Sequence, residues 1–146
     1  MGVGQSYVIQ QGFIASGAAY ALTNGYITGT IAEISAEATV QPAVTVGNIT
    51  PKVIVMEDVL ATRFTQTPSL VGKIIINCAL FGIVRVQVGA AVALGDMLTQ
   101  DATARAITAV RSIAGAQPKQ VIGIALQAAT AAGQTVDVLL TPGETW

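Results

Sequence analysis

Few residues in this chain could carry out chemistry, and the acidic ones are the first candidates. Glu57 and Asp58 form the only adjacent carboxylate pair among the 146 residues. General acid–base chemistry needs two carboxylates that face one cleft, whereas neighbouring residues on a strand point to opposite faces. We therefore interpret Glu57 and Asp58 as a solvated pair, or as ion-pair partners of Arg63 or of a basic residue on another protein.

Two further aspartates, Asp96 and Asp101, lie at predicted turns. They lack the Asp-rich spacing of a calcium-binding loop. An aspartate that follows glycine in a turn has a sufficient structural role in accepting hydrogen bonds from its own backbone. We predict no metal site and no cofactor.

The common arrangements of catalytic nucleophiles and the phosphate-binding motifs of enzymes are missing from the sequence. It contains no histidine, which excludes Ser–His and Cys–His catalysis and histidine-containing zinc sites. The single cysteine, Cys78, lies in the apolar run IIINCALFGIV, where a free cysteine usually packs as a small hydrophobic side chain. Gly72-Lys73 lacks the preceding glycine of a phosphate-binding loop. We predict that the protein is not an enzyme.

The composition restricts the possible partners. Only 10% of the residues are charged, against about 25% in ordinary globular domains, and 52% are hydrophobic. The net charge of −1 leaves no basic surface for nucleic acid. The longest apolar run, residues 74–84, is well short of the ~20 residues of a membrane-spanning helix, and no secretory signal opens the chain. We expect a protein whose outer surface is largely covered by other protein, with neither nucleic acid nor membrane as a partner.

The elements that must position these residues are predicted to be strands. Residues 84–88 alternate, with three valines on one face and Arg85 and Gln87 on the other, and Gly82 in the same run predicts a bulge or corner. Other short strands, separated by turn signals, are predicted at 43–46, 52–58, 97–99, 105–110, 121–126 and 136–140. This pattern predicts a mainly-β domain, either a small β-barrel or a jelly-roll-like sandwich.

One segment is open to two interpretations. Alanine-rich residues 102–114 are compatible with a helix capped by Asp101, but the threonine, isoleucine and valine within them favour a strand. The sequence does not decide between the two.

Residues 1–42 differ from the rest in being rich in glycine and free of positive charge. We predict that they form an extended N-terminal arm, followed by the β-rich domain over 43–146. Aromatic side chains on such an arm suit docking into a partner. The predicted contacts to a capsid or to another subunit are Tyr7, Phe13, Tyr20, Tyr26, Glu57, Asp58 and Arg63.

Four segments carry a family resemblance: GKIIINCALFGIVRV, VGAAVALGDMLTQDA, RAITAV and VIGIALQAATAAGQTVDVLLTPG. Residues 72–143, which contain them, resemble the small capsid cement, or head decoration, proteins of tailed bacteriophages. The corresponding features are the turn at Gly95-Asp96, the strand Gly123–Leu126 and the terminal strand Val136–Leu140.

The resemblance implies a function as well as a fold. Such a protein would form dimers or trimers and bind the major capsid protein on the outer surface of the virion, after synthesis in the bacterial cytoplasm. It would stabilise the shell by clamping neighbouring capsid subunits. The alternatives are a self-assembling β-rich shell or fibre subunit and an oligomeric β-barrel that binds a small ligand. The sequence does not give the symmetry, the lattice position, the host or the contact residues on the shell.

Overall fold

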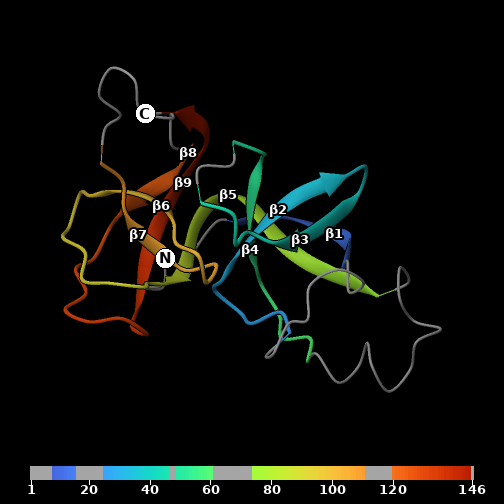
Figure 1. Ribbon diagram of the computed structural model, residues 1–146, viewed down its shortest axis with the longest axis horizontal. Helices are drawn as coiled ribbons and strands as arrows, with labels where there is room; N and C mark the ends of the chain where they lie inside the picture. Colours follow the sequence, from blue (N-terminus) through green and yellow to red (C-terminus); the bar gives the residue numbers. More distant parts are fainter. Residues whose placement is uncertain (1–7, 16–24, 47–48, 61–73, 111–119, 146) are drawn as a thin grey trace.

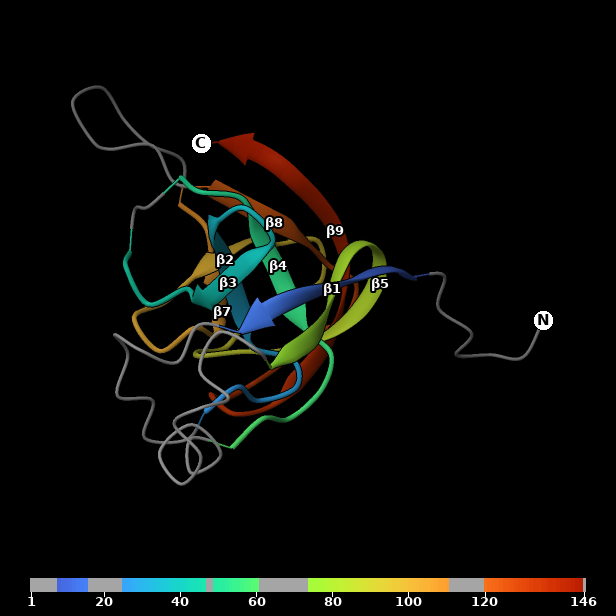
Figure 2. The same cartoon turned by 90° about the vertical axis from the view of Figure 1, so that its right-hand side faces the viewer.

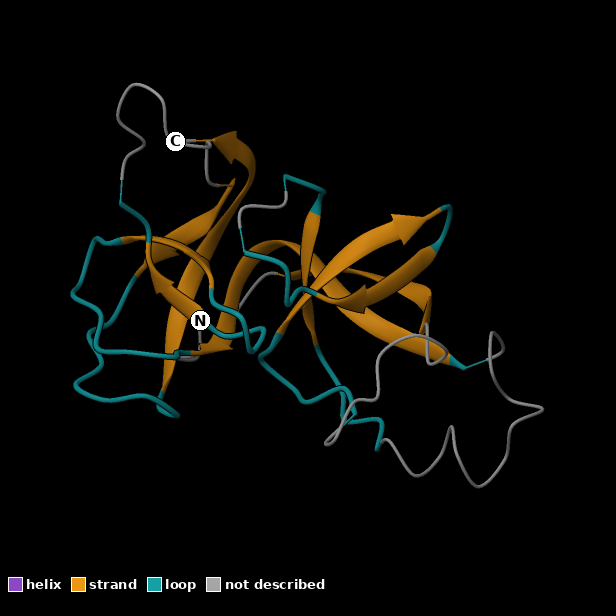
Figure 3. Cartoon of the chain, in the orientation of Figure 1, coloured by secondary structure: helices purple, strands orange, loops and turns teal. Residues whose placement is uncertain are grey.

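The computed structural model describes residues 8–15, 25–46, 49–60, 74–110 and 120–145, and these residues form strands and loops (Figure 3). No helix occurs in these ranges, and therefore none that could span a membrane. The strands are β1 (Val8–Ala15), β2 (Ile31–Ala36), β3 (Thr39–Pro42), β4 (Lys52–Val55), β5 (Ile75–Gln87), β6 (Met97–Gln100), β7 (Ala106–Thr108), β8 (Gln120–Ala125) and β9 (Thr135–Thr145). The prediction of a mainly-β fold is confirmed.

All nine strands belong to one sheet, in the order β1-β3-β2-β4-β5-β9-β8-β6-β7. β1 also pairs with β5, so the first five strands of this order close into a ring. Figure 1 shows β6 to β9 on one side of the molecule and β1 to β4 on the other, with β5 running between them. The result is a sandwich-like fold of one sheet that bends back on itself, and not a single clean barrel.

β5 is the strand that joins the two halves. Its first part pairs with β1 and β4, and residues 82–87 pair with β9. Gly82 has a φ angle of 108°, which other residues rarely adopt, and the β1–β5 register shifts between Ile9 and Gln10 close by. The corner predicted at Gly82 is confirmed, and Figure 2 shows β5 curling strongly.

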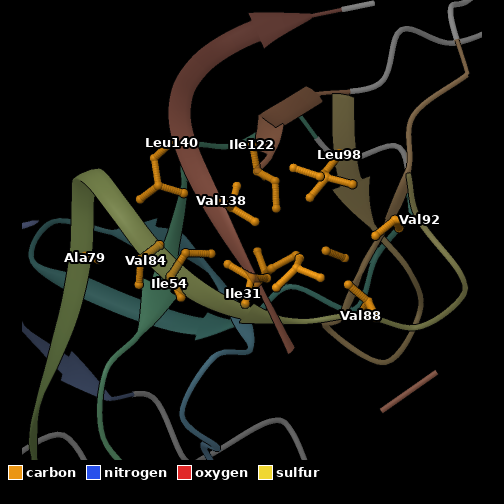
Figure 4. Close-up of a cluster of buried hydrophobic side chains, with 14 of the residues drawn as sticks. Ile31, Ile54, Ala79, Val84, Val88, Val92, Leu98, Ile122, Val138 and Leu140 are labelled. Atoms are coloured by element: carbon orange, nitrogen blue, oxygen red, sulfur yellow. The ribbon is translucent and has the colours of Figure 1, made fainter. Parts of the chain in front are cut away.

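Two clusters of buried apolar side chains form the core. One spans both halves, from Ile31 and Ile54 to Leu98 and Val138 (Figure 4). The other lies within the ring of five strands and includes Phe13. The alternation over residues 84–88 has the predicted result, because the three valines are buried in the first cluster and Arg85 is exposed.

The predicted separation of an N-terminal arm from the domain is wrong wherever the structure describes residues 1–42. β1 pairs with β5 over residues 8–14, and β2 and β3 form an antiparallel hairpin in the same sheet. Position 42 is therefore the end of a strand and not a boundary between an arm and a domain. Residues 1–7 and 16–24 lie outside the described part.

Two glycines in this segment show why it belongs to the sheet. A Cβ atom on Gly12 would lie 2.9 Å from Ile75 Cγ2, so glycine allows β1 to approach β5 closely. Gly29 has a φ angle of 86°, and its N–H donates to the Val55 carbonyl oxygen at 2.8 Å while its own carbonyl accepts from Gln87 N–H at 2.9 Å. Gly12 and Gly29 therefore allow the described part of residues 1–42 to pack and hydrogen-bond against later strands.

The other predicted strands appear as β4 and β6 to β9, with ends that differ by a few residues. The strand predicted at 43–46 is wrong: Ala43 N–H donates to the Ile31 carbonyl, and Val44 N–H then donates to the Pro42 carbonyl, which turns the chain. In the ambiguous segment, 101–104 form a turn and Ala106–Thr108 form β7, so no helix occurs over 102–110. Residues 111–119 lie outside the described part.

Candidate interaction surface

Glu57 and Asp58 both accept hydrogen bonds from backbone N–H groups. Glu57 Oε1 accepts a hydrogen bond from Asn77 N–H at 2.9 Å. Asp58 Oδ1 accepts from both Thr28 N–H at 2.7 Å and Thr28 Oγ1 at 2.9 Å, and these bonds hold the pKa of the Asp58 carboxyl below its usual value. The two side chains bond to different segments of the chain, one at Asn77 and the other at Thr28.

The two turn aspartates have the structural roles predicted for them. Asp96 Oδ2 accepts from Ala93 N–H and from Thr108 Oγ1. Asp101 Oδ1 accepts from the N–H groups of Thr103 and Arg105. Among the described residues, no group of three histidine, cysteine or acidic side chains could hold a metal ion.

Cys78 is fully buried in the ring cluster. Burial, with a smaller contribution from the charge of Glu57, raises the pKa of its thiol to about 12. A thiol with this pKa stays protonated at neutral pH and is a poor nucleophile. The described residues therefore offer no activated thiolate.

The sequence did not predict a buried polar junction between the two halves. Glu33 and Lys52 lie opposite each other on β2 and β4, with 3.6 Å between Lys52 Nζ and Glu33 Oε2. Glu33 also accepts from Gln41 Nε2 and from Thr50 Oγ1. The Gln120 amide nitrogen, placed where it can donate, lies 3.1 Å from the Ile49 carbonyl oxygen and connects β8 to this group. The signal for it was a charged residue in each of two apolar strands, Glu33 within IAEISA and Lys52 at the start of KVIV.

Two of the predicted contact residues are core residues. Phe13 is 4% exposed and Tyr26 is 1% exposed, and the Tyr26 hydroxyl donates to the Val40 carbonyl at 3.0 Å. Neither can contact a partner without opening the fold, so the prediction is wrong for both. Tyr7, Tyr20 and Arg63 lie outside the described residues. Aromatic residues on a glycine-rich segment suggested docking, whereas Phe13 and Tyr26 pack inside the ring of β1 to β5.

Exposed apolar side chains gather instead on the outer face of β1, β5 and β9. Ile9 lies directly opposite Phe81, and Ile83 lies directly opposite Leu139. Directly opposite residues point to the same face of a sheet, and Phe81 and Ile83 are two positions apart on β5. Their exposed fractions are 60% for Ile9, 50% for Phe81, 38% for Ile83 and 39% for Leu139. We call these four residues the outer strip.

The strip has a hollow and a polar end. A hollow of about 320 Å³ is lined by Val8, Ile9, Phe81 and Gly82. Two positions after Ile83 on β5, Arg85 lies opposite Asp137, with 3.3 Å between Arg85 Nε and Asp137 Oδ1.

An apolar centre with a polar edge is the organisation of a protein–protein interface, and a hollow of this size admits a side chain. The strip can therefore bind another protein surface. The sequence contained a signal for it, because Phe81 and Ile83 are in phase with Arg85, the one charged residue of that strand, and must share its outward face.

Comparison with known proteins gives a structural match and no sequence match. No protein-family model matches the chain, and no curated protein matches its sequence. The fold is similar to the crystal structure of the N base of the head fiber gp8.5 in bacteriophage phi29, with a TM-score of 0.56 and 16% sequence identity. The match covers 92% of this chain and 95% of that chain. At this identity the similarity establishes a shared fold.

Proposed function

We propose that the chain is a structural protein of a bacteriophage head, bound to the outside of the capsid, where it clamps neighbouring major capsid subunits. The observation that carries the proposal is the fold similarity to the base of a phage head fiber over nearly the whole length of both chains. The resemblance of residues 72–143 to capsid cement proteins is separate support, because it comes from the sequence and not from the fold.

The physical character of the surface agrees with this function. A shell offers each binding site many times, so contacts of modest strength add up by multivalency. A chain with 10% charged and 52% hydrophobic residues is suited to such apolar contacts. We further propose that the protein is a homo-oligomer without enzymatic activity. In support of the second point, each of the four candidate carboxylates accepts a backbone hydrogen bond: Glu57, Asp58, Asp96 and Asp101.

A second candidate is the base of a fibre that projects from the head. The match to a fiber base favours it, because that chain and this one are similar in extent. The two candidates differ in effect: a cement protein raises the resistance of the head to heat, whereas a fibre base attaches a projection without bridging capsid subunits.

The test uses heads of the phage that encodes the chain, produced without it. Purified protein is added back, the heads are sedimented, and the ratio of bound protein to major capsid protein is measured together with DNA release on heating. A fixed ratio with DNA retained at higher temperature supports the cement function. A fixed ratio with unchanged heat resistance and visible projections in electron micrographs supports the fibre base. Protein that stays in the supernatant contradicts both.

A further inference from the structure

We propose that the outer strip, formed by Ile9, Phe81, Ile83 and Leu139, is covered by a second copy of this chain. The proposal names the surface through which the protein self-associates. It deepens the proposed function, which includes a homo-oligomer, but it does not depend on capsid binding, because it concerns the isolated protein.

The area of the strip fits a small self-association interface. A large apolar side chain that is about half exposed presents roughly 100 Å² of surface, so the four together present on the order of 400 Å². Two copies then bury roughly 800 Å² of apolar surface. The smallest stable interfaces bury about 1,200 Å², of which about 65% is apolar in homodimers, which is also roughly 800 Å². The strip therefore supplies the apolar centre, and the residues around it supply the remainder.

The charges beside the strip are compatible with a second copy. Arg85 and Asp137 stand side by side, so the strip ends in one positive and one negative group with no net charge. Two copies that face each other through this strip therefore do not repel each other with charges of one sign. Each presents an exposed guanidinium and a partly exposed carboxylate to the other, so the ion pair within one copy can be exchanged for pairs between copies.

The shape of the strip also fits a second copy. Phe81 is half exposed and stands at the edge of the hollow that it lines with Val8, Ile9 and Gly82. A projecting side chain and a hollow of about 320 Å³ thus lie in the same patch. A patch that contains both can receive the Phe81 ring of the second copy while its own Phe81 ring enters the hollow of that copy.

The state of the protein before it binds a capsid favours a second copy as the partner that covers the outer strip. A capsid covers the strip only after the protein has bound, whereas the strip would be open to aggregation from synthesis onward. A second copy is present in the same solution at all times and removes this surface from water.

The experiment measures the association of purified full-length protein by analytical ultracentrifugation over a range of concentrations. Phe81→Asp and Leu139→Asp place a charge at the apolar centre of the contact, and each should weaken association by about 30-fold or more. Leu94→Asp is the matched control, because Leu94 is exposed at 69% and lies outside the strip. Circular dichroism and thermal unfolding verify that each variant is folded.

A second measurement does not rely on weakening the contact. Ile83→Cys introduces an exposed thiol, while the native Cys78 is buried and unreactive. A short bis-maleimide reagent should join two Ile83→Cys chains rapidly and two Leu94→Cys chains slowly. The proposal is overturned if the wild type is a monomer at all concentrations, if the strip variants associate as the wild type does, or if the two cysteine variants cross-link at equal rates. Failure of capsid binding alone leaves these results unchanged and concerns only the proposed function.

Discussion

Glu33 on β2 and Lys52 on β4 lie directly opposite each other, and their side chains are 2% and 3% exposed. The pair is therefore a buried ion pair, supported by hydrogen bonds from Gln41 and Thr50 to the carboxylate. Desolvation by burial lowers the pKa of Lys52 although the charge of Glu33 acts in the opposite direction. Keeping this ammonium charged in the interior depends on its partner.

We predict that Lys52→Met destabilises the protein by about 3–5 kcal/mol, because it removes the ammonium that lies 3.6 Å from the buried Glu33 carboxylate. The double variant Glu33→Met, Lys52→Met should lose less stability than the two single variants combined, since it removes both charges of the pair from the interior. Urea unfolding monitored by circular dichroism measures all three values.

Arg85→Ala is the control for this cycle, because the Arg85–Asp137 pair is exposed and should contribute no more than about 1 kcal/mol. Additive losses in the double variant would contradict a coupled pair at the junction.

We predict that deprotonation of the Cys78 thiol reduces the stability of the protein at alkaline pH. Its pKa is raised from 9.0 to about 12 in the folded protein, so the folded state keeps the proton that the unfolded state releases above pH 9. This contribution is complete below pH 9 and decreases as the pH rises toward 12. At pH 10.5 the loss amounts to about 2 kcal/mol.

The measurement compares the wild type with Cys78→Ala by urea unfolding at several pH values from 8 to 10.5. The alanine variant is expected to be less stable at pH 8 because of the cavity, but its stability should fall less steeply with pH. Lys52 titrates in both proteins, so its contribution cancels in the comparison. Parallel pH profiles would show that the thiol is not responsible.

The fold was largely predictable after residue 43 and not before it. Alternation over residues 84–88 predicted the inward and outward faces of β5 correctly, because the period of two is a property of the strand itself. β1 was missed because Gly12 suggested flexibility, whereas glycine is needed there to make room for Ile75. That requirement comes from a strand far away in the sequence and cannot be read locally.

The candidate surface was predicted less well than the fold. Both faces of β5 are apolar around Phe81 and Ile83, so hydrophobicity alone did not distinguish the core face from the exposed face. Aromatic residues were expected at a partner surface, but Phe13 and Tyr26 have the size to fill the interior of the ring and are buried there. Which apolar residues become buried depends on strand pairing, and pairing partners are not visible in a single sequence.

We predict that protonation of the Asp58 carboxylate reduces the stability of the protein at acid pH. Because two hydrogen bonds from Thr28 hold its pKa below the ordinary value of 3.8, its stabilising contribution is complete above that pH and decreases as the pH falls through the lowered value. Asp58→Ala should therefore destabilise the protein by about 1 kcal/mol near pH 6 and by less near pH 3.

Thermal unfolding of the wild type and of Asp58→Ala at pH 6, 4 and 3 tests this. Glu57→Ala is a useful comparison, since Glu57 holds a different backbone group, Asn77 N–H. A stability difference that does not change between pH 6 and pH 3 would contradict the role of the Asp58 carboxylate.

At Gly123, β8 lies close to the backbone of β9. A Cβ atom at this position would overlap the Leu139 carbonyl oxygen and would lie 2.6 Å from Val138 Cγ1. The neighbour is backbone, so the two strands would have to separate to make room. Gly133 provides the contrast: its φ angle is 87°, but a Cβ atom there would meet nothing within 4 Å.

We therefore predict that Gly123→Ala destabilises the protein by about 3 kcal/mol or more, because overpacking and broken β8–β9 hydrogen bonds act together. Gly133→Ala should cost only about 1 kcal/mol, the strain of placing alanine at a positive φ angle. Urea unfolding measures both, and hydrogen exchange should show faster opening of β8 and β9 in the first variant only. Equal losses in the two variants would contradict a steric requirement for glycine at position 123.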